Sequence, residues 1–133
     1  MRFVDTSFWI ALRFRRDGRN PDARALWEGR AGPLVTSELV LGETWTFLRR
    51  RLGHEQARRF RRAAVGVSRL TIVHIDERLE QEAWRWLDRH DERSYSFVDS
   101  TSFALMRRLR LREALAFDGD FAAAGFVEVR PTG

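Results

Sequence analysis

The chain contains no cysteine, and all 24 of its basic residues are arginines because lysine is also absent. The lack of cysteine excludes disulfide bonds and metal sites built from thiolates, and it suits a protein of the cytoplasm, where disulfides are rare. The lack of lysine excludes every mechanism that needs a lysine amine. The chemistry of this chain must therefore be sought mainly among its carboxylates and guanidinium groups.

Long hydrophobic runs are missing as well. No apolar stretch approaches the roughly 20 residues that a membrane-spanning helix needs, so we expect no membrane association. The N-terminal segment carries Asp5 within its apolar stretch and lacks a small-residue cleavage site, so we expect no signal peptide either. A length of 133 residues predicts one domain, residues 1–133, with room for a substantial core.

The charge of the chain is biased to one sign. The formal net charge is +5 and the isoelectric point is about 11.2. A basic protein of this size is a plausible partner for nucleic acid. Because the exclusive use of arginine is explained equally well by GC-rich coding, the overall charge does not decide the function.

Hydrophobic patterning predicts strands that alternate with pairs of helices. The expected strands are residues 3–4, 33–36, 70–75, 114–117 and 126–129, and the expected helices are residues 6–14, 20–29, 37–51, 55–65, 76–90 and 97–110. Asn20 and Asp76 are expected to cap the helices that follow them, and Gly53 to end another. This order predicts an α/β fold with a central, mainly parallel sheet of about five strands, covered by helices on both faces.

Four acidic residues stand at the end of an apolar stretch or inside one: Asp5, Glu43, Asp99 and Asp118. In a parallel sheet of this kind the functional site lies at the carboxyl ends of the strands, and Asp5 and Asp118 each follow an expected strand. If the four carboxylates gathered there, each pair 4 Å apart would repel by roughly 4 kcal/mol at an effective dielectric constant near 20. A divalent cation with oxygen ligands is the simplest compensation, which predicts a metal-dependent phosphodiesterase.

Taken singly, three of these acids also have a purely structural explanation. Asp5 is a good N-cap, Ser96 and Asp99 fit a capping box, and Asp118 begins an Asp-Gly-Asp turn. Glu43 is different, because it lies on the apolar side of its expected helix and no arginine lies three or four positions away. We therefore expect Glu43 to face inward, toward a distant partner.

Four short segments that contain these acids form a recognisable set. They are Val4–Ser7, Thr36–Thr44, Tyr95–Ala104 and Ala116–Phe121. In order and spacing they resemble the motifs of PIN-domain ribonucleases, and in particular those of the VapC-type toxins of bacterial toxin–antitoxin pairs. Each motif alone is weak, but the four together span the chain and are specific. The resemblance implies a PIN-like three-layer α/β/α fold and one PIN domain over residues 1–133.

The resemblance also implies a catalytic cluster that holds Mg²⁺ or Mn²⁺ and is made of Asp5, Glu43, Asp99 and Asp118. The three aspartates are expected to bind the metal, whereas Glu43 is expected to act through water or on a second ion.

Three further polar residues are assigned supporting roles. Thr6 matches the small hydroxyl residue that supports the site in the family. Ser100 either orients Asp99, touches the substrate or belongs to a simple hydroxyl-rich helical turn, and we favour the last. Asp120 either joins the cluster or completes the turn after Asp118, and we favour the turn.

Members of such a family cleave RNA as endoribonucleases, so the resemblance implies products with 5′-phosphate and 3′-hydroxyl ends and an inhibition of translation and growth. It further implies a cognate VapB-like antitoxin whose tail blocks the acidic groove, and a homodimer for which Trp84 is a candidate interface residue. The sequence does not identify the RNA target.

The densest arginine cluster supplies the candidates for contact with substrate phosphates: Arg49, Arg50, Arg58 and Arg62. Such a run is more often a solvated helical face. A non-catalytic RNA-binding module is the alternative function, but it has no use for four converging acids. Receiver-type phosphoacceptors and haloacid-type phosphatases also place acids at strand ends, and both are excluded because they need a lysine.

Overall fold

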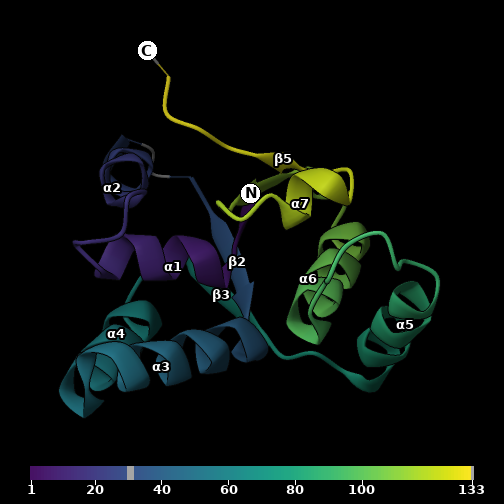
Figure 1. Cartoon of the computed structure of the whole chain (residues 1–133), viewed down its shortest axis with the longest axis horizontal. Helices are drawn as coiled ribbons and strands as arrows, with labels where there is room; N and C mark the ends of the chain where they lie inside the picture. The colour runs from purple at the N-terminus through teal and green to yellow at the C-terminus, as the bar shows by residue number, and fades with distance from the viewer. Residues whose placement is uncertain (30–31, 133) are drawn as a thin grey trace.

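A five-stranded sheet in which every strand is parallel to its neighbours forms the centre of the molecule (Figure 1). The computed structural model describes residues 1–29 and 32–132. The strands, in the spatial order β3-β2-β1-β4-β5, are β1 (Arg2–Val4), β2 (Leu34–Ser37), β3 (Leu70–Val73), β4 (Glu113–Leu115) and β5 (Val127–Glu128). The expected α/β class and strand number are confirmed.

Helices cover both faces of the sheet, as expected. They are α1 (Thr6–Arg13), α2 (Asn20–Gly29), α3 (Glu38–Leu52), α4 (His54–Val65), α5 (Glu77–Asp88), α6 (Phe97–Arg108) and α7 (Asp120–Ala123). Figure 1 shows α1 to α4 grouped on one side of the strands and α5 to α7 on the other. The three-layer arrangement therefore separates the first half of the chain from most of the second half.

The central strands are buried because both of their faces are covered. Phe3, Val4 and Val35 have no more than 1% of their surface exposed. On the side of α5 to α7 the core is aromatic, with the ring of Phe103 4.9 Å from that of Phe121 and 5.1 Å from that of Trp86, measured between centroids. Edge-to-face packing of such rings adds to the hydrophobic stabilisation.

Most helix boundaries follow the local signals that predicted them. The Asp76 carboxylate accepts a hydrogen bond from the Leu79 amide and caps α5, and α3 ends at Gly53, whose φ of +97° favours glycine. The expectation for Asn20 was wrong. This residue is the first of α2, and its side-chain amide donates to the Ala11 carbonyl at 2.8 Å. The short helix α7 was not predicted, since four residues give no periodicity to detect.

The strand order creates the place where a site can form. Strand β1 lies at the centre, with β2 on one side and β4 on the other. The chain therefore leaves β1 toward one edge of the sheet and later returns to its opposite side. At such a switch point the connections diverge and leave a crevice beyond the carboxyl ends of the strands. Asp5 follows β1 directly at this point.

No helix within residues 1–29 and 32–132 has the length and apolar character needed to cross a membrane.

Phe103 is fully buried at the centre of the aromatic core. We expect Phe103→Ala to lower the free energy of unfolding by about 3–5 kcal/mol, because it removes a large side chain and leaves a cavity. Urea denaturation followed by circular dichroism measures this change. Val127→Ala is the matched control, since Val127 is 49% exposed, and it should change stability by less than about 0.5 kcal/mol. A loss below about 1 kcal/mol for Phe103→Ala would contradict this account of the core.

Candidate active site

Asp5 is held in place by the first turn of α1. One oxygen of its carboxylate, Oδ2, accepts hydrogen bonds from the Ser7 amide at 3.1 Å and from the Ser7 hydroxyl at 2.7 Å. The same hydroxyl accepts a hydrogen bond from the Phe117 amide at 3.0 Å. Ser7 therefore ties the end of β1 to the segment after β4. The sequence analysis gave Ser7 no role, although its position two residues after an N-cap aspartate is the available signal.

Asp99 is fixed at the start of α6 by the expected capping box. Its Oδ2 accepts from the Ser96 amide at 3.0 Å, and the Ser96 hydroxyl accepts from the Asp99 amide at 2.9 Å. Asp99 is buried nonetheless, with 8% of its surface exposed. The cap thus holds a carboxylate at the edge of the sheet rather than on an open surface.

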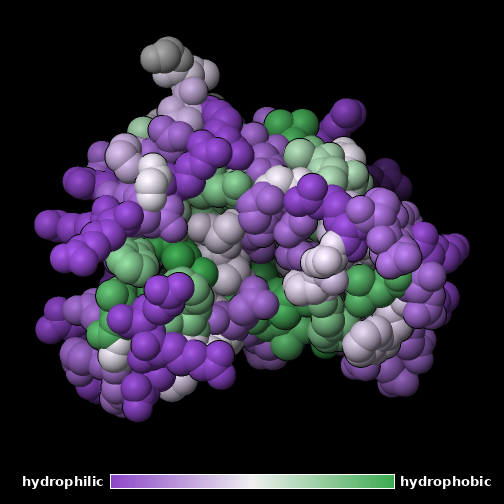
Figure 2. All heavy atoms as spheres, viewed as in Figure 1, coloured by the Kyte–Doolittle hydropathy of each residue, from purple (hydrophilic) through white to green (hydrophobic). Residues whose placement is uncertain are grey.

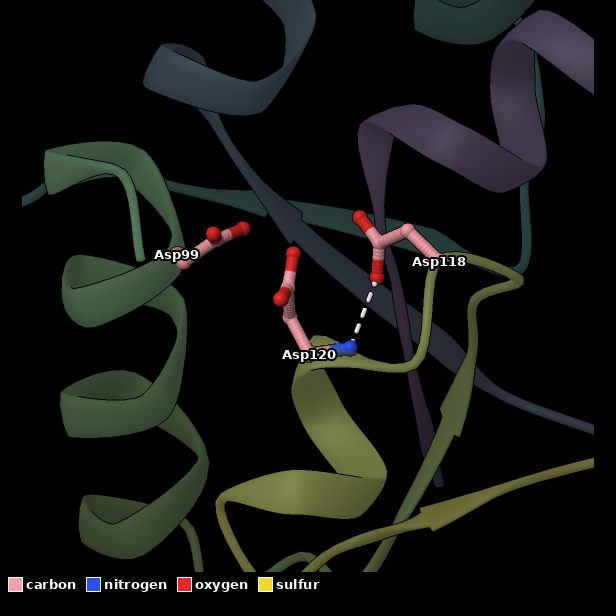
Figure 3. Close-up of side chains that lie close together, drawn as sticks. All are labelled: Asp99, Asp118 and Asp120. Carbon is pink, nitrogen blue, oxygen red and sulfur yellow. Dashed lines mark hydrogen bonds between the residues drawn. The ribbon is translucent and has the colours of Figure 1, made fainter. Parts of the chain in front are cut away.

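Asp118 and Asp120 come from the segment between β4 and α7. The Asp118 Oδ1 accepts from the Asp120 amide at 3.1 Å, a bond made possible by Gly119 in the left-handed region with φ of +83° (Figure 3). Carboxylate oxygens of Asp99, Asp118 and Asp120 lie within 4.8 Å of one another. Figure 3 shows the three side chains pointing toward a shared space. Asp120 completes the turn after Asp118, as preferred from the sequence, and its carboxylate also lies in this cluster.

Electrostatics connects Asp5 to the other three aspartates. The pKa of Asp5 is raised from 3.8 to about 8, mainly by burial and in addition by the nearby charges of Asp118 and Asp99. Burial also raises the pKa of Asp99 and of Asp118 to about 6, and Asp120 adds to both shifts. Asp5, Asp99 and Asp118 therefore lie in one poorly solvated region. Asp5 is not one of the three residues whose carboxylate oxygens lie within 4.8 Å of one another, and its connection to them is electrostatic.

Each of these aspartates has one oxygen engaged and one uncommitted. Asp5 and Asp99 accept hydrogen bonds through Oδ2, whereas Asp118 and Asp120 accept through Oδ1. Within residues 1–29 and 32–132 the second oxygen of each receives no hydrogen bond from an amide, hydroxyl or guanidinium group, although the carboxyl groups of Asp118 and Asp120 are close enough to share a hydrogen bond. The arrangement offers carboxylate oxygens that are positioned by protein contacts and are available to a ligand.

The prediction that Glu43 faces inward was wrong. This residue is exposed on α3 rather than facing inward, so its lack of a local arginine partner has a simple cause: water solvates it. Glu43 lines a surface hollow together with Phe47, Arg50 and Val98, the residue before Asp99. Figure 2 shows hydrophobic atoms between the N-terminal parts of α3 and α6, on a face that is otherwise mostly hydrophilic. Glu43 thus borders the acidic region without joining the cluster.

The two hydroxyl residues expected to support the site differ in their contacts. Ser100 is fully buried and donates to the Ala83 carbonyl at 2.7 Å, so it fastens α6 to α5 and does not orient Asp99 through its side chain. Thr6, next to Asp5, has a buried hydroxyl without a hydrogen-bond partner in the described part of the chain. A buried hydroxyl is ordinarily paired, and Thr6 is therefore the better candidate for a contact that a ligand completes.

The candidate arginines are not equivalent in the structure. Arg50 lines the hollow that also contains Glu43. Arg58 lies on α4 and forms an ion pair with Glu55 at 2.9 Å. Arg49 and Arg62 are exposed. Of the four, Arg50 is the one that shares a surface with residues of the acidic region.

Residues 2–127 match the PIN domain family. The chain belongs to the PIN-domain family. It is 55% identical over 132 residues to a Mycobacterium tuberculosis protein named 23S rRNA-specific endonuclease VapC20, found in two strains, with 98% of this chain and 99% of that protein aligned. This PIN domain is therefore of the VapC toxin type.

Solved structures agree with the fold. The crystal structure of Mycobacterium tuberculosis VapC20, described as a sarcin–ricin loop cleaving toxin, matches with a TM-score of 0.92 and 52% identity over 98% of this chain and all of that one. A toxin–antitoxin complex from Klebsiella pneumoniae matches with a TM-score of 0.67 and 19% identity over 97% of this chain and all of that one. The second likeness concerns the fold alone. The prediction of a ribonuclease toxin is confirmed, and the alternative of a non-catalytic RNA-binding module is not supported.

The residues present suit a hard divalent cation. All donors in the cluster are carboxylate oxygens, which Mg²⁺ and Mn²⁺ prefer to nitrogen or sulfur ligands. Burial first and neighbouring carboxylates second raise the pKa values of Asp5, Asp99 and Asp118, and a bound cation would counter both effects. The acidic region therefore fits the cofactor that PIN nucleases generally use.

The buried Asp5 carboxyl should make the metal-free protein sensitive to pH. Its folded pKa of about 8 lies above the unfolded value of 3.8, so the folded state binds the proton more tightly. This contribution to stability is complete below about pH 4 and is lost as the pH rises through about 8. We expect the free energy of unfolding of EDTA-treated protein to fall by up to about 1.4 kcal/mol per pH unit between about pH 4 and pH 8, and to level off above about pH 8.

Urea titrations at several pH values measure this slope. Asp5→Asn should flatten it, because asparagine can still cap α1 but does not ionise. Asp91→Asn is the matched control, since Asp91 is exposed and should leave the slope unchanged. Equal slopes for wild type and Asp5→Asn would contradict the burial of an ionisable Asp5.

Proposed function

We propose that this toxin is a Mg²⁺- or Mn²⁺-dependent endoribonuclease that cleaves the sarcin–ricin loop of 23S ribosomal RNA. The observation that carries the metal dependence is the convergence of Asp99, Asp118 and Asp120 at the edge of a parallel sheet, with the buried Asp5 in the field of Asp118 and Asp99. The choice of substrate is supported by the 55% identity to a 23S rRNA-specific endonuclease over nearly the full length of both chains.

The aspartates have different roles in metal binding, which follow from how deeply each is buried. Asp5, Asp99 and Asp118 hold the metal, because their carboxylates are the least solvated and their charges are the least compensated. Asp120 joins them through its uncommitted oxygen. Glu43, exposed beside Val98, acts from the rim through water or on a second ion. A bound divalent ion would neutralise the phosphate, acidify a water molecule and stabilise the departing oxygen. The products then carry 5′-phosphate and 3′-hydroxyl ends.

The protein groups around the cluster position the RNA. Arg50 lies on the same hollow as Glu43, and a guanidinium there can pair with a phosphate of the strand entering the site. Apolar surface from Phe47 and Val98 lines the same hollow and suits an unpaired base. Arg49, Arg58 and Arg62 provide a more distant positive field that attracts the polyanion without fixing its register.

Three aspects of its biology follow from the VapC type. The protein acts in the cytoplasm, where ribosomes are found, and slows translation and growth. A cognate VapB-like antitoxin neutralises it by covering the acidic groove. It forms a homodimer, supported by the exposed Trp84 on α5, 48% accessible and stacked on Phe97 with ring centroids 4.3 Å apart.

Cleavage of a synthetic sarcin–ricin hairpin tests the proposed function. Wild-type protein should cut it at one position with Mg²⁺ or Mn²⁺ and stop when EDTA is added. Asp99→Asn should lower kcat/KM at least about 100-fold, the scale on which loss of one electrostatic group acts in catalysis. Asp88→Asn is the control, because Asp88 is exposed at the end of α5. Cleavage that persists in EDTA would disprove the metal dependence, and an uncut hairpin with other RNAs cut would disprove the substrate.

A pair of arginine variants tests the path of the RNA. Arg50→Gln should raise KM and lower the dependence of log KM on log salt concentration by about 1, as expected for the loss of one phosphate contact. Arg58→Gln should change both much less, because Arg58 contributes only to the distant field and is already paired with Glu55. Steady-state kinetics at several salt concentrations measure both. The same effect for the two variants would indicate a diffuse field instead of a defined contact.

A further inference from the structure

Arg93 is the basic residue that forms an ion pair with the aspartate cluster in the described part of the chain. It lies in the segment between α5 and α6, and its Nη2 and Nε are 2.9 Å and 3.0 Å from the same oxygen, Oδ1, of Asp120. Its Nη2 is also 3.4 Å from the Asp118 carbonyl oxygen. Among residues 1–29 and 32–132, no other basic residue forms an ion pair with any of the four aspartates. Arg93 therefore supplies the positive charge that the cluster otherwise lacks.

The geometry of this pair leaves room for exchange. Both donors of Arg93 go to one oxygen, so the second oxygen of Asp120 remains available to another cation. The Arg93 side chain is 41% exposed, whereas that of Asp120 is 19% exposed. The Arg93 side chain thus contacts Asp120 at the margin of the cluster and remains partly in solvent. A planar guanidinium in this position matches the oxygens of a phosphate.

We propose that Arg93 is the resident counter-cation of the aspartate cluster and a positioning residue for the RNA phosphate. It pairs with Asp120 while the cluster lacks a divalent ion. A divalent ion among the carboxylates repels the guanidinium and competes with it for Asp120. The freed fork of Arg93 then pairs with the phosphate of the bound strand. The inference rests on the proposed metal-dependent function and adds a group that this function does not need by itself.

A purely structural role makes the opposite prediction. If Arg93 only fastened the segment before α6 to Asp120, its loss would disorder Asp120 and weaken metal binding. If Arg93 competes with the metal, its loss removes a nearby positive charge and strengthens metal binding while RNA cleavage declines. The sign of the change in metal affinity therefore separates the two roles.

The test uses the full chain, stripped with EDTA and then titrated with Mn²⁺ by calorimetry. Arg93→Gln should bind Mn²⁺ about tenfold more tightly than wild type, as expected from removing one positive charge about 5 Å away in a hydrated site. It should also lower kcat/KM for the hairpin at least about tenfold, mainly through KM. Arg93→Lys should keep Mn²⁺ affinity near wild type, because the charge remains, and should recover only part of the cleavage, because the fork is lost.

Arg89→Gln is the matched control. It removes the same charge from an exposed residue that begins the same segment, and it should leave both measurements unchanged. Weaker or unaltered Mn²⁺ binding by Arg93→Gln, in a protein that melts like wild type, would overturn the inference and leave the proposed function intact. Wild-type protein that neither binds Mn²⁺ nor cleaves the hairpin with it would overturn the proposed function, and this inference with it.

Discussion

The mutual repulsion of carboxylates at the carboxyl end of the sheet is the constraint on which the site depends. Asp5 stands at the end of the central strand with only 2% of its surface exposed, and it lies in the field of Asp118 and Asp99. Burial at this point costs free energy that hydrogen bonds from Ser7 offset only in part. The fold tolerates that cost, and a bound cation removes it by converting repulsion into coordination.

Helix capping and the proposed metal binding are compatible uses of the same side chain. From the sequence, a cap seemed to compete with a catalytic role for Asp5, Asp99 and Asp118. In the structure a backbone amide engages one oxygen of each and leaves the other uncommitted. The cap fixes the side-chain rotamer, so the uncommitted oxygen points in a set direction. Binding a ligand then costs little additional side-chain conformational entropy. The signals that argued against function at each position are what preorganises the site.

The sequence was informative where a local pattern determines the outcome. Strand ends and caps are written in a few adjacent residues, so the positions of Asp5, Asp99 and Asp118 could be inferred. The prediction that Glu43 faces inward was wrong. Helical spacing relative to apolar neighbours does not say whether the adjacent layer of helices extends far enough to cover the side chain. The contact of Arg93 with Asp120 could not be predicted either, because it spans 27 positions and depends on how the segment after α5 folds back. Such contacts carry no periodicity that a sequence could display.

The acidic residues come from both helical layers, so their arrangement depends on the whole fold. Asp5 begins α1 on one side of the sheet and Asp99 begins α6 on the other, while Asp118 follows the strand between them. The Ser7 hydroxyl joins the end of β1 to the segment after β4, because it donates to Asp5 and accepts from Phe117. A loss of packing in either layer would separate carboxylates that the fold brings close together. The arrangement of the proposed site therefore depends on the stability of both layers.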